Sequence, residues 1–401
     1  MPSITKLCFR VKKLKILLVH NAYQHKGGED SVMEAEFALL GDHGHSVELF
    51  TRHNDALTHM PKVVAAAQTM WSVKSGHAFE KALRSFQPDV VHVHNTFPLI
   101  SPSIYWVAER MSVPVVQTLH NFRLMCPQAM FLRDGRVCED CLGKLPWRGA
   151  VRGCYRDSIV QSTVLASMVS MHRAIGTWKN KVTRYIALND FCRDKFIIGG
   201  LPGERIVVKP NFVDSKSPTI KGVRSDFLFV GRLSPEKGID VLLSAANAID
   251  GVTVRFAGTG PQSEHLQGFS CVHALGQLSK NEVNAEMSRA CAVIVPSIWF
   301  ETFGMVAVES FANGTPVIAS RIGVLPNLII DGKTGLLFEP GNVLDLVEKM
   351  KWAQQHPHQM AEMGRNARSL FEAEYSAERN YAQLMTIYED AIQDLKNRSR
   401  K

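Results

Sequence analysis

Short apolar runs alternate with longer amphipathic segments along most of the chain. Runs of four to eight apolar residues predict strands that helices cover on both faces. Their alternation with helix-length segments predicts parallel sheets joined by right-handed crossovers, an α/β fold. The predicted strands of the first half are Lys15–His20, Ser46–Phe50, Val90–His94, Pro114–Thr118 and Tyr185–Leu188, and those of the second half are Phe227–Val230, Val252–Ala257, Val272–Leu275, Ala292–Val295 and Pro316–Ala319.

The alternation of strands and helices begins again after Asp214. This second series of predicted elements divides the chain into two predicted domains. The segment Ser215–Ser225 is rich in Pro, Gly, Ser and Lys and has few apolar residues, so it predicts a linker. We expect a Rossmann-like domain over residues 1–214 and a second over 215–375. The end of the chain, residues 376–401, contains a predicted amphipathic helix at Ala377–Lys396. Ligands of such sheets bind at the carboxyl ends of the strands.

The charge is concentrated in the first half of the chain. The whole chain has a net charge of +8, but residues 1–213 hold 27 Lys and Arg against 17 Asp and Glu, a net of +10. This half therefore attracts anions, and phosphate groups, nucleic acid and an anionic membrane are all conceivable partners. No nucleic-acid motif is present, so we expect no nucleic-acid partner. Residues 1–13 are basic and lack a signal-peptide core, and no run has the length of a membrane span, which predicts a cytoplasmic protein.

Two cations follow the first predicted strand of the second half. Arg232 comes directly after that strand and Lys237 stands where the next helix is expected, within Gly231–Gly238 (GRLSPEKG). An Arg fork and a Lys point charge at such a turn suit a diphosphate. The alternative is a pair of solvated surface cations.

Two glutamates eight residues apart mark a second candidate segment. Between Glu301 and Glu309, Gly304 permits close backbone approach to a ligand and stands where a helix is expected to begin. The carboxylates suit the hydroxyls of a sugar and a ribose, although salt bridges would explain them equally. A Gly-x-Gly turn at Gly258 and Gly260 fits a nucleotide loop or a plain tight turn.

Taken together and in order, these segments resemble the family 4 glycosyltransferases of the GT-B fold. The matching sequences are GRLSPEKG, AGTGP, PSIWFETFGMVAVE, GTPVIAS and DGKTGLLFEPGN, at residues 231–238, 257–261, 296–309, 314–320 and 331–342. The resemblance implies two Rossmann-like domains facing each other across a cleft, with the C-terminal helix crossing back to the N-terminal domain.

The resemblance also implies a role for each matching residue. Glu301 would contact the donor sugar and Glu309 the ribose, while Arg232 and Lys237 would hold the diphosphate. The loop residues Gly258, Gly260, Phe303 and Gly304 would complete the donor site. In the first half, the glycines Gly27 and Gly28 follow the first strand and would close over the diphosphate, and His120 would lie beside the donor sugar.

The implied activity is that of a retaining, metal-independent hexosyl- or glycosyltransferase without a cofactor. It would move a sugar from a nucleotide-sugar to a glycan or lipid-linked acceptor, in the biosynthesis of cell-surface polysaccharide or lipopolysaccharide. A nucleotide-sugar epimerase and a non-catalytic nucleotide-sugar binder are the alternatives. The presence of Arg232, Lys237, Glu301 and Glu309 argues against both.

Four of the eight cysteines cluster in a basic segment of the first half. Cys126, Cys138, Cys141 and Cys154 are spaced as C-x11-C-x2-C-x12-C. Such a set could hold a structural zinc ion in a tetrahedral site, although only one C-x2-C pair is present. Buried thiols in a long insertion are the alternative. A subset of family 4 enzymes resembles this chain in having a cysteine-rich insertion near the acceptor site.

An apolar helix is expected at Ile159–Ile175, immediately after the basic segment. It could rest on an anionic membrane where a lipid-linked acceptor arrives, which would make the protein peripheral at the inner face of the cytoplasmic membrane. Equally, it could be a buried helix that covers the sheet.

Overall fold

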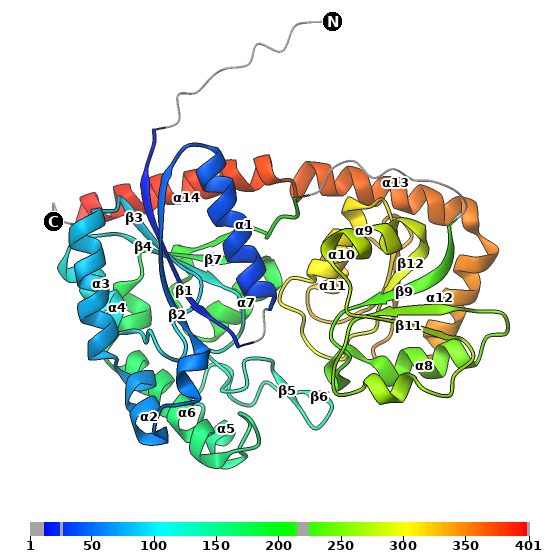
Figure 1. Ribbon diagram of the computed structural model, residues 1–401, viewed down its shortest axis with the longest axis horizontal. Helices are drawn as coiled ribbons and strands as arrows, with labels where there is room; N and C mark the ends of the chain where they lie inside the picture. The colour runs from blue at the N-terminus through cyan, green and yellow to red at the C-terminus, as the bar shows by residue number, and fades with distance from the viewer. Residues whose placement is uncertain (1–11, 25–26, 215–223, 399–401) are drawn as a thin grey trace, which may run out of the picture. The chain divides into compact units, whose positions relative to one another are not determined.

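The computed structural model of the chain describes residues 12–24, 27–214 and 224–398 (Figure 1). They divide into two compact units, one of residues 1–117, 180–184 and 387–401 and the other of residues 118–179 and 185–386. The predicted linker Ser215–Ser225 and the basic segment 1–13 lie almost wholly outside the described residues, and the predicted domain boundary stays a prediction.

A six-stranded sheet is formed by the first half of the chain, in the order β2-β1-β3-β4-β7-β8. The pairs β1–β2, β1–β3, β3–β4 and β7–β8 are parallel, as predicted. The central strands are buried along their length, because helices cover both of their faces, whereas the edge strand β2 buries Phe50 alone among its residues. The strands are β1 (Lys15–Ala22), β2 (Ser46–His53), β3 (Val90–Val93), β4 (Val115–Leu119), β7 (Arg184–Ala187) and β8 (Ile206–Val208).

The second half forms a sheet of six parallel strands in the order β11-β10-β9-β12-β13-β14. Strand β9 therefore lies between β10 and β12, and the winding reverses beside it, as in a doubly wound Rossmann-like fold. The strands are β9 (Ser225–Val230), β10 (Val254–Ala257), β11 (Val272–Gly276), β12 (Ala290–Val295), β13 (Val317–Ser320) and β14 (Gly335–Phe338).

Successive side chains of β9 enter two different cores, one on each face of the second sheet. Phe227 and Phe229 pack with α8 (Ile239–Asn247) and α12 (Val343–Gln355), and Leu228 packs with α10 (Met305–Ala312) and α13 (Pro357–Glu374). This follows from the period of two in a strand. Burial on both faces explains why the strand reads as a continuous apolar run.

Side-chain caps fix the start of several helices. Ser72, Ser158, Asn189, Ser279 and Asn342 each accept a hydrogen bond from a backbone N–H of the first turn. The helices of the first half are α1 (Gly28–Asp42), α2 (Lys62–Met70), α3 (Val73–Phe86), α4 (Ser103–Arg110), α5 (Trp147–Val151), α6 (Ile159–Ala174) and α7 (Asp190–Ile198). Those of the second half are α8 (Ile239–Asn247), α9 (Lys280–Arg289), α10 (Met305–Ala312), α11 (Leu325–Leu328), α12 (Val343–Gln355), α13 (Pro357–Glu374) and α14 (Ala377–Arg398).

The predicted C-terminal helix is confirmed as α14. Its last part, from Ile387, belongs to the first unit, where Arg184 bonds Asp394 at 2.6 Å. Among the described residues, no helix combines the length and apolar character that crossing a bilayer requires.

Candidate active site

The loops after β9, β10 and β12 meet at the carboxyl ends of these strands. The backbone N–H of Leu233 donates to the carbonyl oxygen of Thr259 at 3.0 Å, and the N–H of Ile298 donates to the backbone carbonyl oxygen of Glu236 at 3.0 Å. These bonds tie the loop after β9 to its neighbours on both sides. The three loops therefore form one structure where the winding of the sheet reverses, the usual place for a ligand in such folds.

Glycine is required where these loops touch. A Cβ atom on Gly258 would lie 1.9 Å from the carbonyl oxygen of Gly231, and one on Gly238 would lie 1.9 Å from that of Pro296. Gly258 and Gly238 also have positive φ angles of 144° and 72°. The glycines predicted from the Gly-x-Gly and GRLSPEKG segments thus allow one backbone to approach another.

Glu301 and Lys237 form an ion pair within this loop cluster. The Lys237 Nζ atom lies 2.6 Å from Glu301 Oε1. The same carboxylate oxygen accepts hydrogen bonds from Ser297 Oγ at 2.8 Å and Trp299 Nε1 at 3.1 Å. The Lys237 ammonium also lies 5.2 Å from the centre of the Trp299 ring, within the range of a cation–π contact.

The partners of Glu301 keep its carboxylate ionised in spite of burial. Burial alone would raise the pKa of this carboxyl group. The charge of Lys237, together with the hydrogen bonds from Lys237, Ser297 and Trp299, outweighs burial and lowers the pKa below its ordinary value. The site thus holds a fixed negative charge and a fixed positive charge side by side.

The helix near Lys237 begins later than the sequence indicated. Lys237 ends a short 3-10 turn, Pro235–Lys237, and α8 starts at Ile239 after the left-handed residue Gly238. The positive φ of Gly238 interrupts the helical conformation at that point. Arg232 is exposed on the loop directly after β9.

The segment around α10 has the predicted arrangement. Gly304, with a φ of 80°, is the residue before the helix, and Glu309 is a partly buried residue of its second turn. Burial raises the pKa of Glu309 to about 7, against the opposing charge of Lys280. The side chain of Phe303 packs in the core, 6.1 Å from the Tyr375 ring, so only its backbone is left to face a ligand.

The glycine loop of the first unit, which contains Gly27 and Gly28, is bonded to the carboxylate of Asp30 at the start of α1. The N–H of Gly27 donates to Asp30 Oδ2 at 2.7 Å, and Asp30 Oδ1 lies 2.8 Å from His20 Nε2. Burial would raise the pKa of Asp30, but the bonds with His20, Gly27 and Tyr23 outweigh it and lower the pKa. The N–H of Gly27 is therefore already used, and Gly28 begins the helix.

His120 directly follows β4 and is buried. It is not among the residues whose bonds converge on Glu301. The sequence reasoning did not single out Ser297 and Trp299 as site residues. The signal that could have found them is their position on the loop that leaves β12, where Ser297 stands four residues and Trp299 two residues before Glu301.

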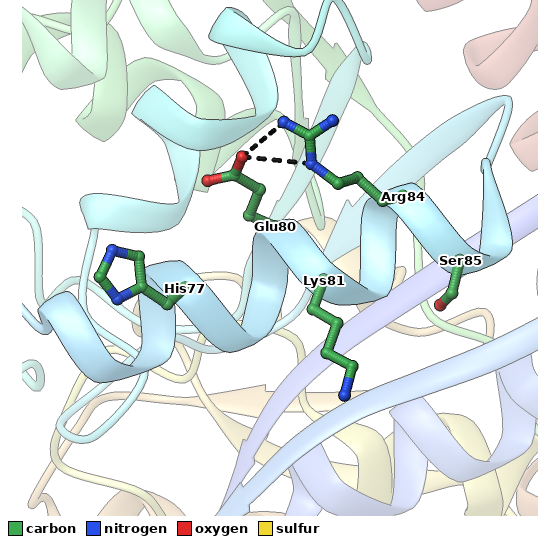
Figure 2. Close-up of a pocket in the computed structure, with 5 residues that line it drawn as sticks. All are labelled: His77, Glu80, Lys81, Arg84 and Ser85. Carbon is green, nitrogen blue, oxygen red and sulfur yellow. Dashed lines mark hydrogen bonds and ion pairs between the residues drawn. The ribbon is translucent and has the colours of Figure 1, made fainter.

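Surface hollows elsewhere do not coincide with this site. A hollow of about 490 Å³ lies over α3 (Figure 2). Glu80 and Arg84 form an ion pair in it, and the remaining lining residues are His77, Lys81 and Ser85. All five residues belong to one exposed helix. Their arrangement is that of a solvated helix face with an (i, i+4) ion pair.

Profiles of two known families match the chain. Residues 27–217 match the family described as "Glycosyltransferase Family 4", and residues 212–370 match "Glycosyl transferases group 1". The glycogen synthase of Mycobacterium tuberculosis is 27% identical over 80% of this chain and 78% of that protein.

Solved structures share the fold over nearly the whole chain. A sucrose-phosphate synthase from Thermosynechococcus elongatus has a TM-score of 0.70 at 19% identity, covering 94% of this chain and 98% of its own. The HepE protein of Anabaena in complex with UDP-glucose has a TM-score of 0.63 at 19% identity, covering 96% of this chain and 100% of its own. At such identities the likeness concerns the fold.

Proposed function

Because this chain belongs to the family 4 glycosyltransferases of the GT-B fold, we propose that it transfers a sugar from a nucleoside-diphosphate sugar to a glycan or lipid-linked acceptor. The proposed transfer retains the anomeric configuration and uses no metal ion. The proposal depends most on one observation, the Lys237–Glu301 pair at the carboxyl end of the second sheet.

The cations of this site suit the leaving diphosphate. Lys237 and Arg232 stand on the loop after β9, where their charges would stabilise the charge that grows as the bond from the anomeric carbon to the phosphate oxygen breaks. The new bond from the acceptor oxygen forms on the same face. The acceptor proton passes to the leaving phosphate oxygen, so this route needs no protein nucleophile and no metal.

The two carboxylates suit the neutral parts of the donor. Glu301 would accept hydrogen bonds from sugar hydroxyls while Lys237 turns to the diphosphate, and Glu309 would accept those of the ribose. The loops at Gly258, Gly260 and Gly304 would let backbone N–H groups approach the nucleotide. HepE binds UDP-glucose, which supports a nucleotide-sugar donor for a chain of the same fold.

The first half of the chain would contribute His120 and the glycine loop. Buried His120 would donate a hydrogen bond to the donor sugar. At the glycine loop, Gly28 is the stronger candidate for an anion contact, since Asp30 already binds the N–H of Gly27.

An apolar patch beside basic residues supports a lipid-linked acceptor and peripheral contact with an anionic membrane. Helix α6 buries one face, but its first residues are exposed, Val160 at 74%, and α5 exposes Trp147 at 59%. The two helices pack on each other. Exposed apolar side chains among cations are typical of a helix at a lipid interface. The remaining members of the patch are Leu145, Val151, Ile159, Lys144, Arg148, Arg152 and Arg156. Such a location suits assembly of cell-surface polysaccharide or lipopolysaccharide.

A donor-release assay tests the function. The protein is incubated with UDP-, GDP- and dTDP-sugars, with and without a chelator, and the released nucleotide is measured. We expect release from one nucleotide class, unchanged by chelation, and an α-linked product from an α-linked donor in the NMR spectrum. An isomerised nucleotide-sugar would instead identify an epimerase, and binding without turnover in the presence of an acceptor panel would identify a binding protein.

A further inference from the structure

Four cysteine side chains line one small cavity in the segment between β4 and α6. Cys126, Cys138, Cys141 and Cys154 all face a space of about 20 Å³. A cavity needs roughly 10–15 Å³ to hold one water molecule, so this space suits a single ion and excludes an organic ligand. Since the four residues come from three separate stretches of chain, their meeting is a property of the fold and not of local spacing.

The backbone presents the C-x2-C pair at the end of a hairpin. Strands β5 (Leu132–Arg133) and β6 (Arg136–Val137) are antiparallel, and Cys138 follows β6 directly. Its N–H donates to the Phe131 carbonyl at 2.7 Å, and turns follow through Leu142. A turn after a hairpin brings two cysteines three residues apart to one side, which is the arrangement that metal-binding knuckles use.

The other two cysteines are held against this turn by packing and by backbone bonds. Gly149 of α5 lies so close to Pro127 that a Cβ would meet the Pro127 Cγ at 2.8 Å. The N–H of Cys154 donates to the Gly149 carbonyl at 3.0 Å. These contacts join the stretch around Cys126 to the stretch around Cys154.

The charge around the cavity complements a metal with four thiolates. A divalent ion with four thiolate ligands carries a net charge of −2. Arg133 and Arg152 both line the cavity, and they pair with Asp134 and Asp140, which are not among its lining residues. The two arginines would offset the charge of the filled site.

Regular structure is scarce in this stretch, so something else must fix it. Between Leu119 and Ile159 the described elements are the two-residue strands β5 and β6 and the five-residue helix α5. Long segments with so little secondary structure are commonly stapled by metals or disulfides. The four thiols are free in this structure.

We propose that Cys126, Cys138, Cys141 and Cys154 bind one Zn²⁺ ion in a tetrahedral site. Four protein ligands leave no open position, so this zinc is structural and takes no part in sugar transfer. It would fix the segment that presents Trp147 and the rest of the apolar patch. With zinc–sulfur bonds of about 2.3 Å, the sulfur atoms would lie about 3.8 Å apart.

A second group of ligating side chains offers a competing site. Among the described residues, Glu36, His92 and His94 form the group of three ligands whose atoms lie within 4.8 Å of one another. The four cysteine sulfur atoms are not such a group, so they must move closer to one another to bind one metal ion. The three rival residues are wholly buried and include His92, which already bonds the Tyr388 hydroxyl at 2.7 Å.

Metal analysis of the full-length protein, purified without chelators, tests the proposal. We expect one zinc per chain by mass spectrometry of the elements, and loss of that zinc in a Cys138→Ser, Cys141→Ser double variant. Cys291→Ser, at a half-buried cysteine of the second sheet, is the matched control and should keep its zinc. If the double variant does not fold, Cys154→His retains a ligand and should keep the metal.

Cobalt supplies a readout that does not depend on activity. Protein grown with Co²⁺ should show the absorption of a tetrahedral four-thiolate site, and this spectrum should disappear in the double variant. Zinc that survives in the folded double variant would assign the metal elsewhere, for example to Glu36, His92 and His94. Iron in place of zinc, a disulfide among the four cysteines, or protein that neither contains nor retains zinc would each overturn the proposal. A failed sugar-transfer assay would not affect these outcomes.

Discussion

The hydroxyl group of Tyr388 lies 2.7 Å from Nδ1 of His92, joining α14 to strand β3 in the core of the first unit. Both side chains are fully buried. The bond connects residues 296 positions apart and, together with the Arg184–Asp394 ion pair, holds α14 against the first sheet.

Tyr388→Phe should destabilise the first unit. The change removes a buried hydrogen bond at nearly constant volume, at an expected cost of about 1–3 kcal/mol in the free energy of unfolding. Urea denaturation measures this loss. Tyr381→Phe, at a half-buried position of the same helix, should cost less, and equal losses in the two variants would contradict the assignment.

Lys237→Met should abolish most of the sugar transfer and leave the chain folded. Loss of one cation that stabilises the leaving diphosphate should lower kcat by about 10²–10³-fold. Steady-state kinetics and circular dichroism measure the two effects. Lys349→Met removes a partly buried (i, i+4) pair with Asp345 on α12 and should leave kcat unchanged. Turnover near the wild-type rate in Lys237→Met would refute the role of Lys237.

Glu301→Gln should lower kcat by a similar factor, since the neutral side chain cannot match the charge of Lys237. The double variant Lys237→Met, Glu301→Gln should lose less than the two single losses combined, because each single change leaves the partner's charge unpaired in the protein without donor and the double change does not. Additive losses of kcat in the double variant would show that the residues act independently.

Glu309→Gln should stabilise the chain at alkaline pH and weaken donor binding. The folded chain raises the pKa of Glu309 from 4.5 to about 7, so ionisation opposes folding increasingly as the pH rises from about 4.5 to 7. The variant removes this cost, and the expected gain is up to about 3 kcal/mol at pH 8 but about 1 kcal/mol at pH 5.

Urea denaturation at the two pH values measures the gain of Glu309→Gln, with the exposed Glu348→Gln on α12 as control. The same titration predicts that the KM for the donor falls as pH rises through about 7, because the ionised carboxylate is the better acceptor for ribose hydroxyls. A gain in stability that is equal at pH 5 and pH 8 would contradict this account.

Gly258→Ala should prevent the loops of the second sheet from meeting. Its Cβ would lie 1.9 Å from the Gly231 carbonyl oxygen, and its φ is 144°. We expect a loss of about 3 kcal/mol or more in the free energy of unfolding. Gly251 also has a positive φ, but a Cβ atom added there would have no other atom within 4 Å. Gly251→Ala should therefore cost only about 1 kcal/mol in the free energy of unfolding. Thermal unfolding compares the two.

Val160→Glu should weaken binding to vesicles that contain an anionic lipid such as phosphatidylglycerol. The change puts a carboxylate in the exposed apolar patch of α5 and α6, where it would be repelled by the lipid surface. Co-sedimentation at low and high salt measures the effect. Val63→Glu is the control, since Val63 on α2 is 80% exposed and lies outside the patch. Equal loss in both variants would argue against a localised membrane contact.

The sequence predicted strands that are buried on both faces, such as β1, and also more exposed strands, such as β2 and β11. Runs such as Lys15–His20 stay apolar along their length because helices cover both sides, and the pattern is then unambiguous. Strand β8 was missed because three residues make too short a run. Strand β14 was missed because it starts at Gly335, and sequence patterns assign glycine to turns. In the structure this glycine is needed within the sheet, since a Cβ atom there would lie 2.1 Å from the Val317 carbonyl oxygen.

Individual site residues were more predictable than their bonds. Lys237 and Glu301 were both singled out, but they are 64 positions apart, and the packing of Gly238 on Pro296 and the backbone hydrogen bond from Ile298 to Glu236 bring their loops together. The role of Trp299 as a donor to Glu301 depends on the path of that loop, which no local pattern specifies. The use of the Gly27 N–H by Asp30 likewise depends on the observed start of α1.

All six strands of the second sheet come from one uninterrupted stretch, Ser225–Phe338, which also contains Lys237, Glu301 and Glu309. A recombination event that exchanged this stretch between related genes would move together the donor contacts proposed for Lys237, Glu301 and Glu309, while those proposed for His120 and Gly28 would stay with the first half. Under the proposed function, most of the contacts that select the nucleotide-sugar would therefore be inherited as one block, separately from the first half of the chain.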